Sequence, residues 1–388
     1  MNYRVVYFIL ALALPALAAA QGQTLTPAEI GIQKAQAQIA KQPRYVPAYS
    51  SLAMAYARRA RETSDVQFYQ KAEDTLRDAL KMEPENFEAL RVRAWLLLGR
   101  HEFAKALEAA KGLNKRSPDD VMVYGYLVDA NAELGNYSDA VNAAQWMLNL
   151  RPGNVAGLTR AAYLRELHGD ISGALDLMQS AYDSTPYQES EDRAWLLTQM
   201  AHLQFVSGNL AEAEKYATGA LGVFPDYHYA LGTLAQVRTA QHRYDEAATL
   251  LEKRYSAAPH AENLYSLAEA LAHAGRADEA ARDFAEFERK SLAESQIADN
   301  SNHELMAYYN DFAHQPEKAL KIAEQELKRR HDVFTLDGYA WSLAGMGDYA
   351  AAEIQMKQAL ATGIKDPKIL DHARIISEGL TRRASLKD

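Results

Sequence analysis

The sequence predicts an all-helical (all-α) solenoid, in which about nine helical hairpins stack side by side between N- and C-terminal capping helices. Three observations support this prediction. Prolines recur every 34 residues, alanine recurs at a fixed distance before each of them, and apolar residues keep helical spacing around that alanine. Internal repeats of this length are typical of stacked helical units, because one hairpin alone cannot bury its apolar face.

The composition fits a folded, acidic protein. Of 388 residues, 48% are hydrophobic and 24% are charged, which is enough apolar surface for a buried core. The 51 acidic residues exceed the 42 basic ones, and a net charge of -9 disfavours binding to nucleic acid or to an anionic membrane surface. The chain contains no cysteine, which excludes disulfides, thiolate nucleophiles and zinc ribbons.

Residues 1–20 have the features of a secretory signal peptide. One cation, Arg4, precedes an apolar run over residues 5–18, and small residues follow. The run is too short to span a bilayer and Pro15 interrupts it, which disfavours a membrane anchor. We expect a mature chain that begins at Gln21, is extracytoplasmic (periplasmic or secreted), and has no stable membrane insertion.

Prolines mark the repeat boundaries. Four successive prolines lie 34 residues apart, and two more are again 34 apart after a gap of 39 residues. They are Pro84, Pro118, Pro152, Pro186, Pro225 and Pro259. Because proline cannot donate the backbone hydrogen bond of a helix, each one ends the second helix of a hairpin.

An alanine stands twelve residues before each of these prolines. The six are Ala72, Ala106, Ala140, Ala174, Ala213 and Ala247. Large, mostly apolar residues lie three positions before each alanine and apolar residues four positions after it, so all share one helical face. We expect the alanine where the two helices of a hairpin cross most closely, because a larger side chain would overpack that crossing.

A first helix precedes each of these second helices, and a glycine between them lets the chain reverse, as at Gly135, Gly169 and Gly208. A capping box from Thr26 to Glu29 opens the N-terminal cap, and Asp366-Pro367 opens a C-terminal helix to about Leu380. The predicted units are a cap at 21–44, repeats at 45–84, 85–118, 119–152, 153–186, 187–225, 226–259, 260–299, 300–331 (degenerate) and 332–365, and a cap with tail at 366–388.

The sequence Gly135-Asn136-Tyr137, followed by Ala140 and Pro152, is similar to the tetratricopeptide repeat (TPR) family. The resemblance covers most of the mature chain and continues more weakly over residues 260–365. It implies a right-handed superhelical solenoid that binds a protein or peptide in its concave groove. The repeated lysine and asparagine by which some members clamp a carboxylate are missing here, which disfavours the binding of chaperone tails.

Two repeats exceed the period. The first has about seven extra residues within 57–71, including Arg58 and Arg61, and the fifth has five extra around 187–192. We expect both insertions to form surface loops, which in repeat arrays are more often solvated than functional.

Signatures of catalysis are weak. His303-Glu304 begins like the zinc motif H-E-x-x-H but lacks the second histidine. The spacing of residues 345–350 fits a dinucleotide fingerprint, yet that fingerprint needs a preceding strand, and Gly347 is the turn glycine of a repeat. We therefore predict no enzyme activity, no metal site and no cofactor.

The first helices carry aromatic and charged residues on the face that the resemblance assigns to the groove. The candidate peptide-binding residues are Arg91, Trp95, Tyr126, Tyr163, Trp195, His202, Tyr229, Tyr265 and Trp341. They contact either a ligand or neighbouring repeats, and the sequence leaves both open. Trp146 occupies a position that is small or polar in other repeats, so it faces water and is a second candidate contact, on the convex side.

The sequence thus predicts a secreted scaffold or adaptor without catalysis. Because the chain is acidic, a partner segment with basic and apolar residues is favoured. Two alternatives remain: a subunit of an envelope assembly or polysaccharide export apparatus, and a hydrolase or transferase with its site in the groove.

Overall fold

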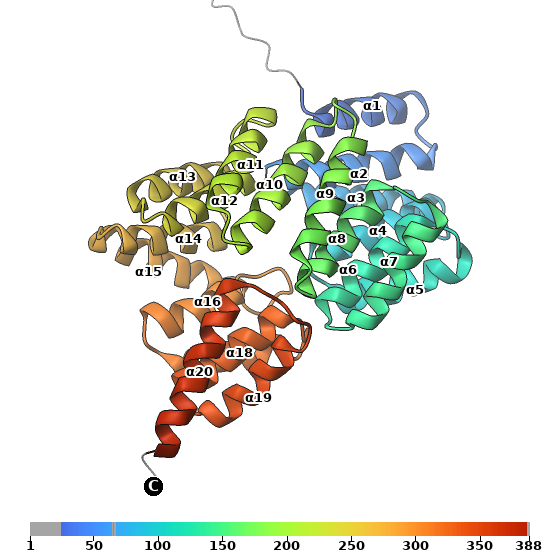
Figure 1. Cartoon of the computed structure of the whole chain (residues 1–388). Helices are drawn as coiled ribbons and strands as arrows, with labels where there is room; N and C mark the ends of the chain where they lie inside the picture. Colours follow the sequence, from blue (N-terminus) through green and yellow to red (C-terminus); the bar gives the residue numbers. More distant parts are fainter. Residues whose placement is uncertain (1–24, 64, 66, 386–388) are drawn as a thin grey trace, which may run out of the picture.

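The computed structural model describes residues 25–385 except 64 and 66, and these residues form a stack of helices without strands (Figure 1). The predicted signal peptide lies outside the described residues. Among the described helices, none combines the length and hydrophobicity that crossing a bilayer requires.

The helices between the two caps pair into nine hairpins, numbered repeats 1 to 9 in chain order. Repeats 1 to 5 are α2 (Val46–Thr63) with α3 (Gln67–Met82), α4 (Phe87–Gly99) with α5 (Phe103–Arg116), α6 (Val121–Glu133) with α7 (Tyr137–Leu150), α8 (Val155–Leu167) with α9 (Ile171–Ser184), and α10 (Ser190–Val206) with α11 (Leu210–Val223). Repeats 6 to 9 are α12 (His228–Ala240) with α13 (Tyr244–Ala257), α14 (Ala261–His273) with α15 (Ala277–Glu294), α16 (Asn302–Ala307) and the π-helical turn η1 (Tyr308–Phe312) with α17 (Pro316–Glu326), and α18 (Val333–Gly345) with α19 (Tyr349–Leu360).

The hairpins form as the proline and alanine positions predict. The recurrent alanines of repeats 1 to 6 are all fully buried. Each second helix ends two residues before its proline; α3, for example, ends at Met82, before Pro84. The small alanine and the helix-ending proline therefore fix the length and the close packing of each unit.

The turns inside the hairpins adopt the left-handed backbone conformation. Gly135, Gly169 and Gly208 have φ values of 79°, 73° and 78°, as predicted. In repeats 2 and 6 the same turn is made by His101 and His242, with φ values of 54° and 58°. Histidine tolerates this conformation less well than glycine. The sequence pattern, which looked for glycine, missed these two turns.

Capping helices cover both ends. α1 (Pro27–Lys41) begins with the predicted capping box, in which the Thr26 backbone N–H donates to Glu29 Oε2 at 2.9 Å. α20 (Pro367–Ser385) continues five residues past its expected end near Leu380. Within it, Arg382 pairs with Glu378 at 3.3 Å, one helical turn away, which supports the added length.

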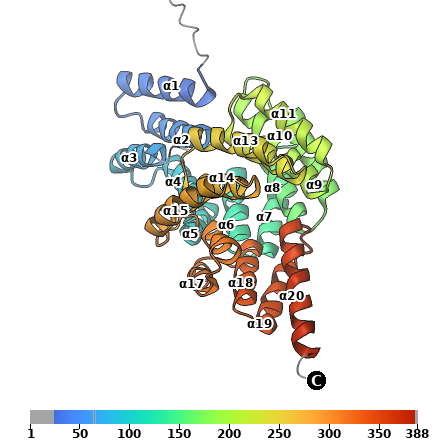
Figure 2. The ribbon, with the colours of Figure 1, turned by 90° about the vertical axis from the view of Figure 1, so that its left-hand side faces the viewer.

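The array turns back on itself, so that its last helices lie beside the middle ones (Figures 1 and 2). Buried Val128 of α6 and Leu164 of α8 share one apolar core with Val333 of α18 and with Ile364, in the segment before α20. This core joins repeats 3 and 4 to repeat 9. The concave face is therefore partly covered by the array itself.

Candidate functional site

The two insertions meet each other across the array. Arg58 and Arg61, near the end of α2, face Glu189, Glu191 and Asp192, at the start of α10; these five residues are called the charged seam below. Arg58 pairs with Glu189 at 2.6 Å, and Arg61 pairs with Asp192 at 2.5 Å. The Arg61 Nε–H also donates to Glu191 Oε1 at 3.0 Å. The charged seam thus joins repeat 1 to repeat 5.

The expectation that the insertions form solvated surface loops holds for Tyr187, which precedes α10 and is 84% exposed, but it is wrong for the extra residues within α2 and α10. The extra residues lengthen helices: α2 has 18 residues and α10 has 17, whereas α4 has 13. The added turns carry the arginines and carboxylates toward each other, and the ion pairs hold them there. A periodic sequence shows that residues are extra, but it does not show that two distant insertions pair.

Glu191 is the centre of the charged seam. It is only 1% exposed and accepts hydrogen bonds from Arg61 and from the Tyr227 hydroxyl, the latter at 2.6 Å. Burial disfavours the charged form of Arg61, but Glu191 and Asp192 together keep its pKa raised. The neighbouring His228 Nε2–H donates to the Arg61 carbonyl at 3.1 Å, and burial lowers the pKa of His228 to about 4.

A second seam joins repeats 3 and 4 to the C-terminal part of the array through close backbone contacts. A Cβ atom on Gly135 would lie 2.5 Å from the His331 carbonyl oxygen, and one on Gly169 would overlap the Gly363 carbonyl oxygen. The Val333 backbone N–H donates to the hydroxyl of Tyr137 at 2.9 Å. These six residues, with Glu133 and Arg330, are called the glycine seam.

One partly buried ion pair belongs to the glycine seam. Arg330 contacts Glu133 at 3.1 Å. Burial raises the pKa of Glu133 to about 7, and nearby Asp332 adds to this rise, although Arg330 opposes it. The glycine seam therefore contains a carboxyl group that titrates close to neutral pH.

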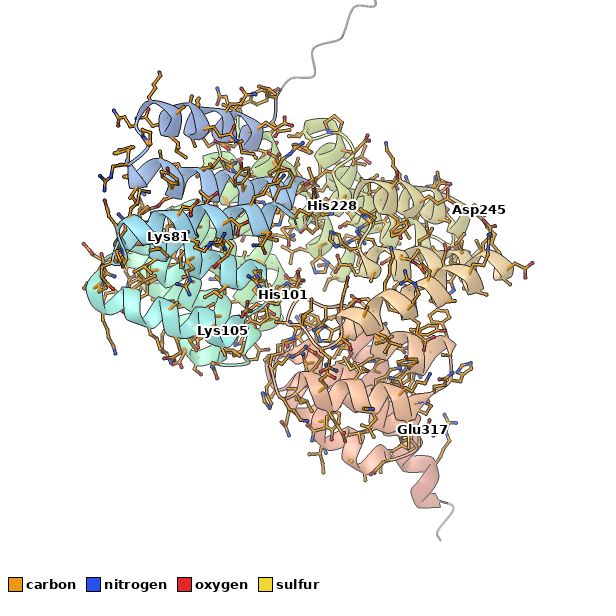
Figure 3. The ribbon with its side chains drawn as sticks, turned by 180° about the vertical axis from the view of Figure 1, so that it is seen from behind. Lys81, His101, Lys105, His228, Asp245 and Glu317 are labelled. Carbon is orange, nitrogen blue, oxygen red and sulfur yellow. The ribbon has the colours of Figure 1, made fainter. Side chains whose placement is uncertain are left out.

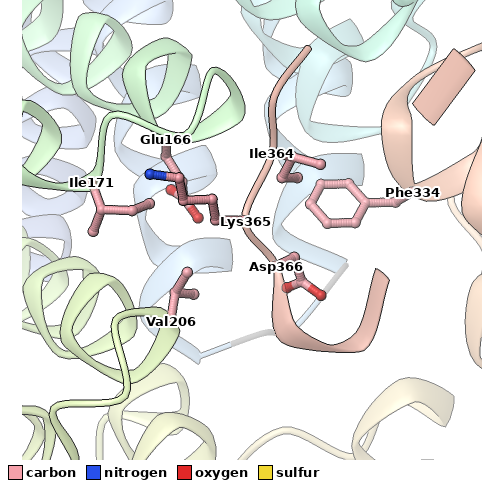
Figure 4. A pocket seen from close by; sticks show the side chains of 7 residues that line it. All are labelled: Glu166, Ile171, Val206, Phe334, Ile364, Lys365 and Asp366. Atoms are coloured by element: carbon pink, nitrogen blue, oxygen red, sulfur yellow. The ribbon is translucent and has the colours of Figure 1, made fainter. Parts of the chain in front are cut away.

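Beside the glycine seam lies a small pocket of about 210 Å³, a volume that includes open solvent (Figure 4). It is lined by Glu166, Ile171, Val206, Phe334, Ile364, Lys365 and Asp366. His202 Nε2 lies 2.7 Å from Glu166 Oε1. Burial disfavours the charged form of His202, yet the hydrogen bond and charge of Glu166 raise its pKa above the ordinary value. His202, a predicted groove residue, thus has an intramolecular partner.

Two predicted groove aromatics lie in the core. Tyr126 is 1% exposed and Tyr265 is 6% exposed, so neither is available to a ligand in this conformation. Tyr265 packs against Phe284 and Phe287. Of the two roles that the sequence left open for these tyrosines, the structure shows packing against neighbouring repeats rather than an open groove.

Two further predicted residues are engaged by neighbours. Arg91 pairs with Glu88 and with Asp120, both at 2.7 Å. The Trp341 Nε1–H donates to Asp311 at 2.7 Å, and its ring stacks on His372. These contacts connect adjacent hairpins and the C-terminal cap, which is the packing role that the sequence left open.

Three more predicted aromatics are half-buried. Trp95 and Trp195 pack against the cores of repeats 1 to 2 and 4 to 5 respectively, and Tyr163 packs against the core shared with repeat 9. Trp146, by contrast, is 52% exposed, as predicted from its position. Whether any of these residues contacts a ligand stays a prediction.

Tyr229 is the predicted groove aromatic that remains exposed, at 37%. It belongs to a cluster on the axis of the array, called the axial niche, where repeats 1, 2, 6 and 7 meet the segment after α15. The axial niche consists of Tyr69, His101, Tyr229, Glu262 and Asp299. Figure 3 shows His101 close to the centre of the molecule, whereas Asp245 and Glu317 lie toward its outside.

The electrostatics of the axial niche link Tyr229 to Tyr69 and Glu262, and link Asp299 to Tyr69 and His101. Burial raises the pKa of Tyr229 to about 12, and Tyr69 and Glu262 add to that rise. Burial and Asp299 raise the pKa of Tyr69, and His101 Nδ1 lies 3.5 Å from Asp299 Oδ1. The side chains of Glu262 and Asp299 are 51% and 41% exposed. The niche therefore contains two tyrosines and two exposed carboxylates, one of which lies 3.5 Å from His101.

Sequence reasoning missed four of the five niche residues. Tyr69 opens a second helix and Asp299 lies in a linker, so neither has a position in the first-helix pattern. Across the described part of the chain, no group of histidine and carboxylate side chains is arranged to hold a metal ion. His303, from the incomplete zinc motif, instead contacts the Thr335 hydroxyl at 3.0 Å.

A family model for the tetratricopeptide repeat matches residues 52–121, 127–189, 198–262 and 233–291, which together are more than half of the chain. The regular proline-spaced repeats fall within these ranges. Comparison with curated proteins finds no match.

Two solved structures share the fold. A chain of the APC/C hetero-tetramer Cut9-Hcn1 aligns with a TM-score of 0.53 and 12% identity, over 89% of this chain and 59% of that one. The human IFIT1 dimer with m7Gppp-AAAA aligns with a TM-score of 0.54 and 13% identity, over 86% of this chain and 85% of that one. At such identities the likeness concerns the superhelical solenoid alone.

Proposed function

Because this chain belongs to the tetratricopeptide repeat family, whose fold suggests a protein-interaction scaffold, we propose that it is a secreted, non-catalytic scaffold that binds a protein segment at the axial niche. One observation carries the choice of site. Tyr229 is the predicted groove aromatic that remains exposed, and two exposed carboxylates, Glu262 and Asp299, accompany it.

The chemistry of the niche suits a basic side chain with apolar neighbours. A lysine or arginine is attracted by the face of a tyrosine ring and by a carboxylate, and an aromatic ring gives large contact area for few frozen torsions. The net charge of -9 adds long-range attraction for a basic segment. Rising salt should therefore slow the encounter without abolishing binding.

The proposed location rests on residues 1–20. A cleavable signal peptide would release a mature chain of net charge -10 that begins at Gln21, because Arg4 is the charged residue lost. N-terminal sequencing of the protein from the envelope and from the cytoplasm tests this point. An intact N-terminus on protein confined to the cytoplasm would refute the proposed location.

Binding can be tested with peptides selected from a displayed library on the purified protein. Their affinity would be measured by calorimetry for the parent, Tyr229→Ala, Glu262→Gln and the distant control Asp245→Asn. We expect selected peptides to be rich in basic and apolar residues, and Tyr229→Ala to weaken binding by at least about thirtyfold, as for an interface anchor. Asp245→Asn should bind like the parent.

Circular dichroism would first establish that the variants keep the helical content and melting temperature of the parent. If folded Tyr229→Ala and Glu262→Gln bind the peptides as tightly as the parent, the axial niche is not the site.

A further inference from the structure

One face of α7 differs from the rest of the outer surface. Its exposed residues from the second turn onward are Val141, Asn142, Gln145, Trp146, Asn149 and Leu150, called the α7 face below. Trp146 is 52% exposed, Val141 43% and Leu150 37%. Three large apolar side chains are thus exposed to water on one helix.

Trp146 is held in place at this face. Its ring stacks on Tyr124 of α6, with the ring centroids 6.0 Å apart and the planes 16° from parallel. An aromatic ring fixed in this way loses little freedom on binding, which is typical of residues that anchor an interface.

The α7 face contains no charged residue, unlike the corresponding faces of other second helices. At positions after the recurrent alanine, exposed charged residues on four of those helices are Glu108 and Lys111 on α5, Asp176 and Asp183 on α9, Lys215 on α11, and Glu252 and Lys253 on α13, whereas the exposed Asp139 of α7 lies before its alanine. From Val141 to Leu150, by contrast, ten consecutive residues of α7 carry no charge.

The polar groups of the α7 face can pair with copies of themselves. A side-chain amide both donates and accepts hydrogen bonds, so asparagine can pair with asparagine, whereas a carboxylate or an ammonium group repels its own copy. Gln145 Nε2–H already donates to Asn149 Oδ1 at 2.8 Å, which leaves a carbonyl acceptor on Gln145 and amide donors on Asn149.

The ability of these amide groups to pair with their own copies matters in a symmetric dimer. In a two-fold dimer the same patch of both subunits meets, so residues near the axis face their own copies. For a chain of net charge -9, a charge-free face avoids like-charge repulsion at such a contact. We propose that the α7 face is an interface between two copies of this chain, with Trp146 as its anchor.

Association can be measured by sedimentation velocity over a range of concentrations, with the protein as purified from cells. We expect a reversible dimer, and we expect Trp146→Glu to raise its dissociation constant at least about thirtyfold. The matched control is Ile354→Glu on α19, where an apolar side chain is 58% exposed but Lys357 is exposed nearby. This control should leave the dimer intact. A parent chain that stays monomeric at all concentrations, or a Trp146→Glu variant that dimerises like the parent, would overturn the proposal.

The absence of cysteine allows a second test of the contact itself. Single cysteines at Val141, Gln145 and Asn149, compared with Ile354→Cys, would be oxidised and separated on a non-reducing gel. We expect a covalent dimer from at least one α7 position, because an isologous contact brings some residue near its own copy. If no α7 position forms more cross-link than Ile354→Cys, another surface joins the copies or none does. Either result rejects the proposal.

Discussion

The charged seam and the glycine seam close the same array by different chemistry. In the charged seam, long side chains from α2 and α10 bridge the gap, and the buried Glu191 depends on its partners. In the glycine seam, two backbones touch because Gly135 and Gly169 have no side chain. The charged seam therefore depends on side chains that form ion pairs, whereas the backbone contacts of the glycine seam depend on the absence of a Cβ atom at Gly135 and Gly169.

The largest effect is expected from Arg61→Met. The substitution leaves the Glu191 carboxylate buried without its cation, and breaking a buried pair in this way typically destabilises by about 3 to 5 kcal/mol. Urea unfolding measures the loss, and hydrogen exchange should show that residues 190–195 open first. Arg61→Met combined with Glu191→Gln should recover part of the stability. A single variant as stable as the parent would show that the charged seam does not hold the array.

Next in size is the effect of Gly169→Ala in the glycine seam. The left-handed conformation alone costs about 1 to 2 kcal/mol for a residue with a Cβ, and the overlap with Gly363 adds about 1 to 3 kcal/mol. Gly208→Ala is the matched control, because Gly208 has the same conformation but no atom within 4 Å of the added Cβ. The difference in unfolding free energy between the two variants isolates the seam contact. Equal losses of unfolding free energy in the two variants would mean that Gly169 is needed only for the backbone conformation of its turn.

The two seams should respond to pH in opposite directions. The pKa of His228 falls from 6.5 to about 4 on folding, so the unfolded chain takes up this proton first and the charged seam loses stability as pH falls through that range. The pKa of Glu133 rises from 4.5 to about 7, so the folded chain keeps a proton that the unfolded chain has lost, and stability falls as pH rises between these values.

Unfolding free energies of His228→Gln and Glu133→Gln, each measured against pH beside the parent, test these directions. Each variant should lose its own part of the pH dependence, whatever other groups titrate. Parallel curves for parent and variant would contradict the assigned group.

The smallest effect is expected from Arg58→Gln. Arg58 and Glu189 are 27% and 36% exposed, and an ion pair so accessible to solvent contributes about 0 to 1 kcal/mol. Salt should remove most of this contribution, whereas it should change the effect of Arg61→Met much less. Melting temperatures of both variants at low and high salt provide the measurement. A large, salt-independent loss in Arg58→Gln would show that the whole seam acts as one buried network.

The hairpins were predictable because their signals are local and periodic. A buried alanine, a turn glycine and a proline recur within each 34-residue unit, and each has a steric reason for its position. The seams join residues far apart, such as Arg61 and Glu191, 130 positions from each other, or Arg330 and Glu133, 197 positions apart. No repeat spacing encodes such pairs, which depend on the pitch of the whole array.

The candidate site was predictable only in part, for the same reason. The first-helix offset found Tyr229 and also selected Tyr126 and Tyr265, which are core residues. A residue offset identifies one face of a helix, but the next repeat and the repeats across the array decide how much of that face is exposed. Trp146 was easier to place, because one position could be compared across six repeats.

The paired insertions have a consequence for how such a gene can change. Open solenoids gain and lose whole modules readily, because each module contacts only its neighbours. Here, adding or deleting one hairpin between repeats 1 and 5 would rotate α10 away from α2 and separate Arg61 from Glu191. The charged seam can therefore form with only one number of hairpins between α2 and α10. Related chains with a different number of hairpins should lack both insertions.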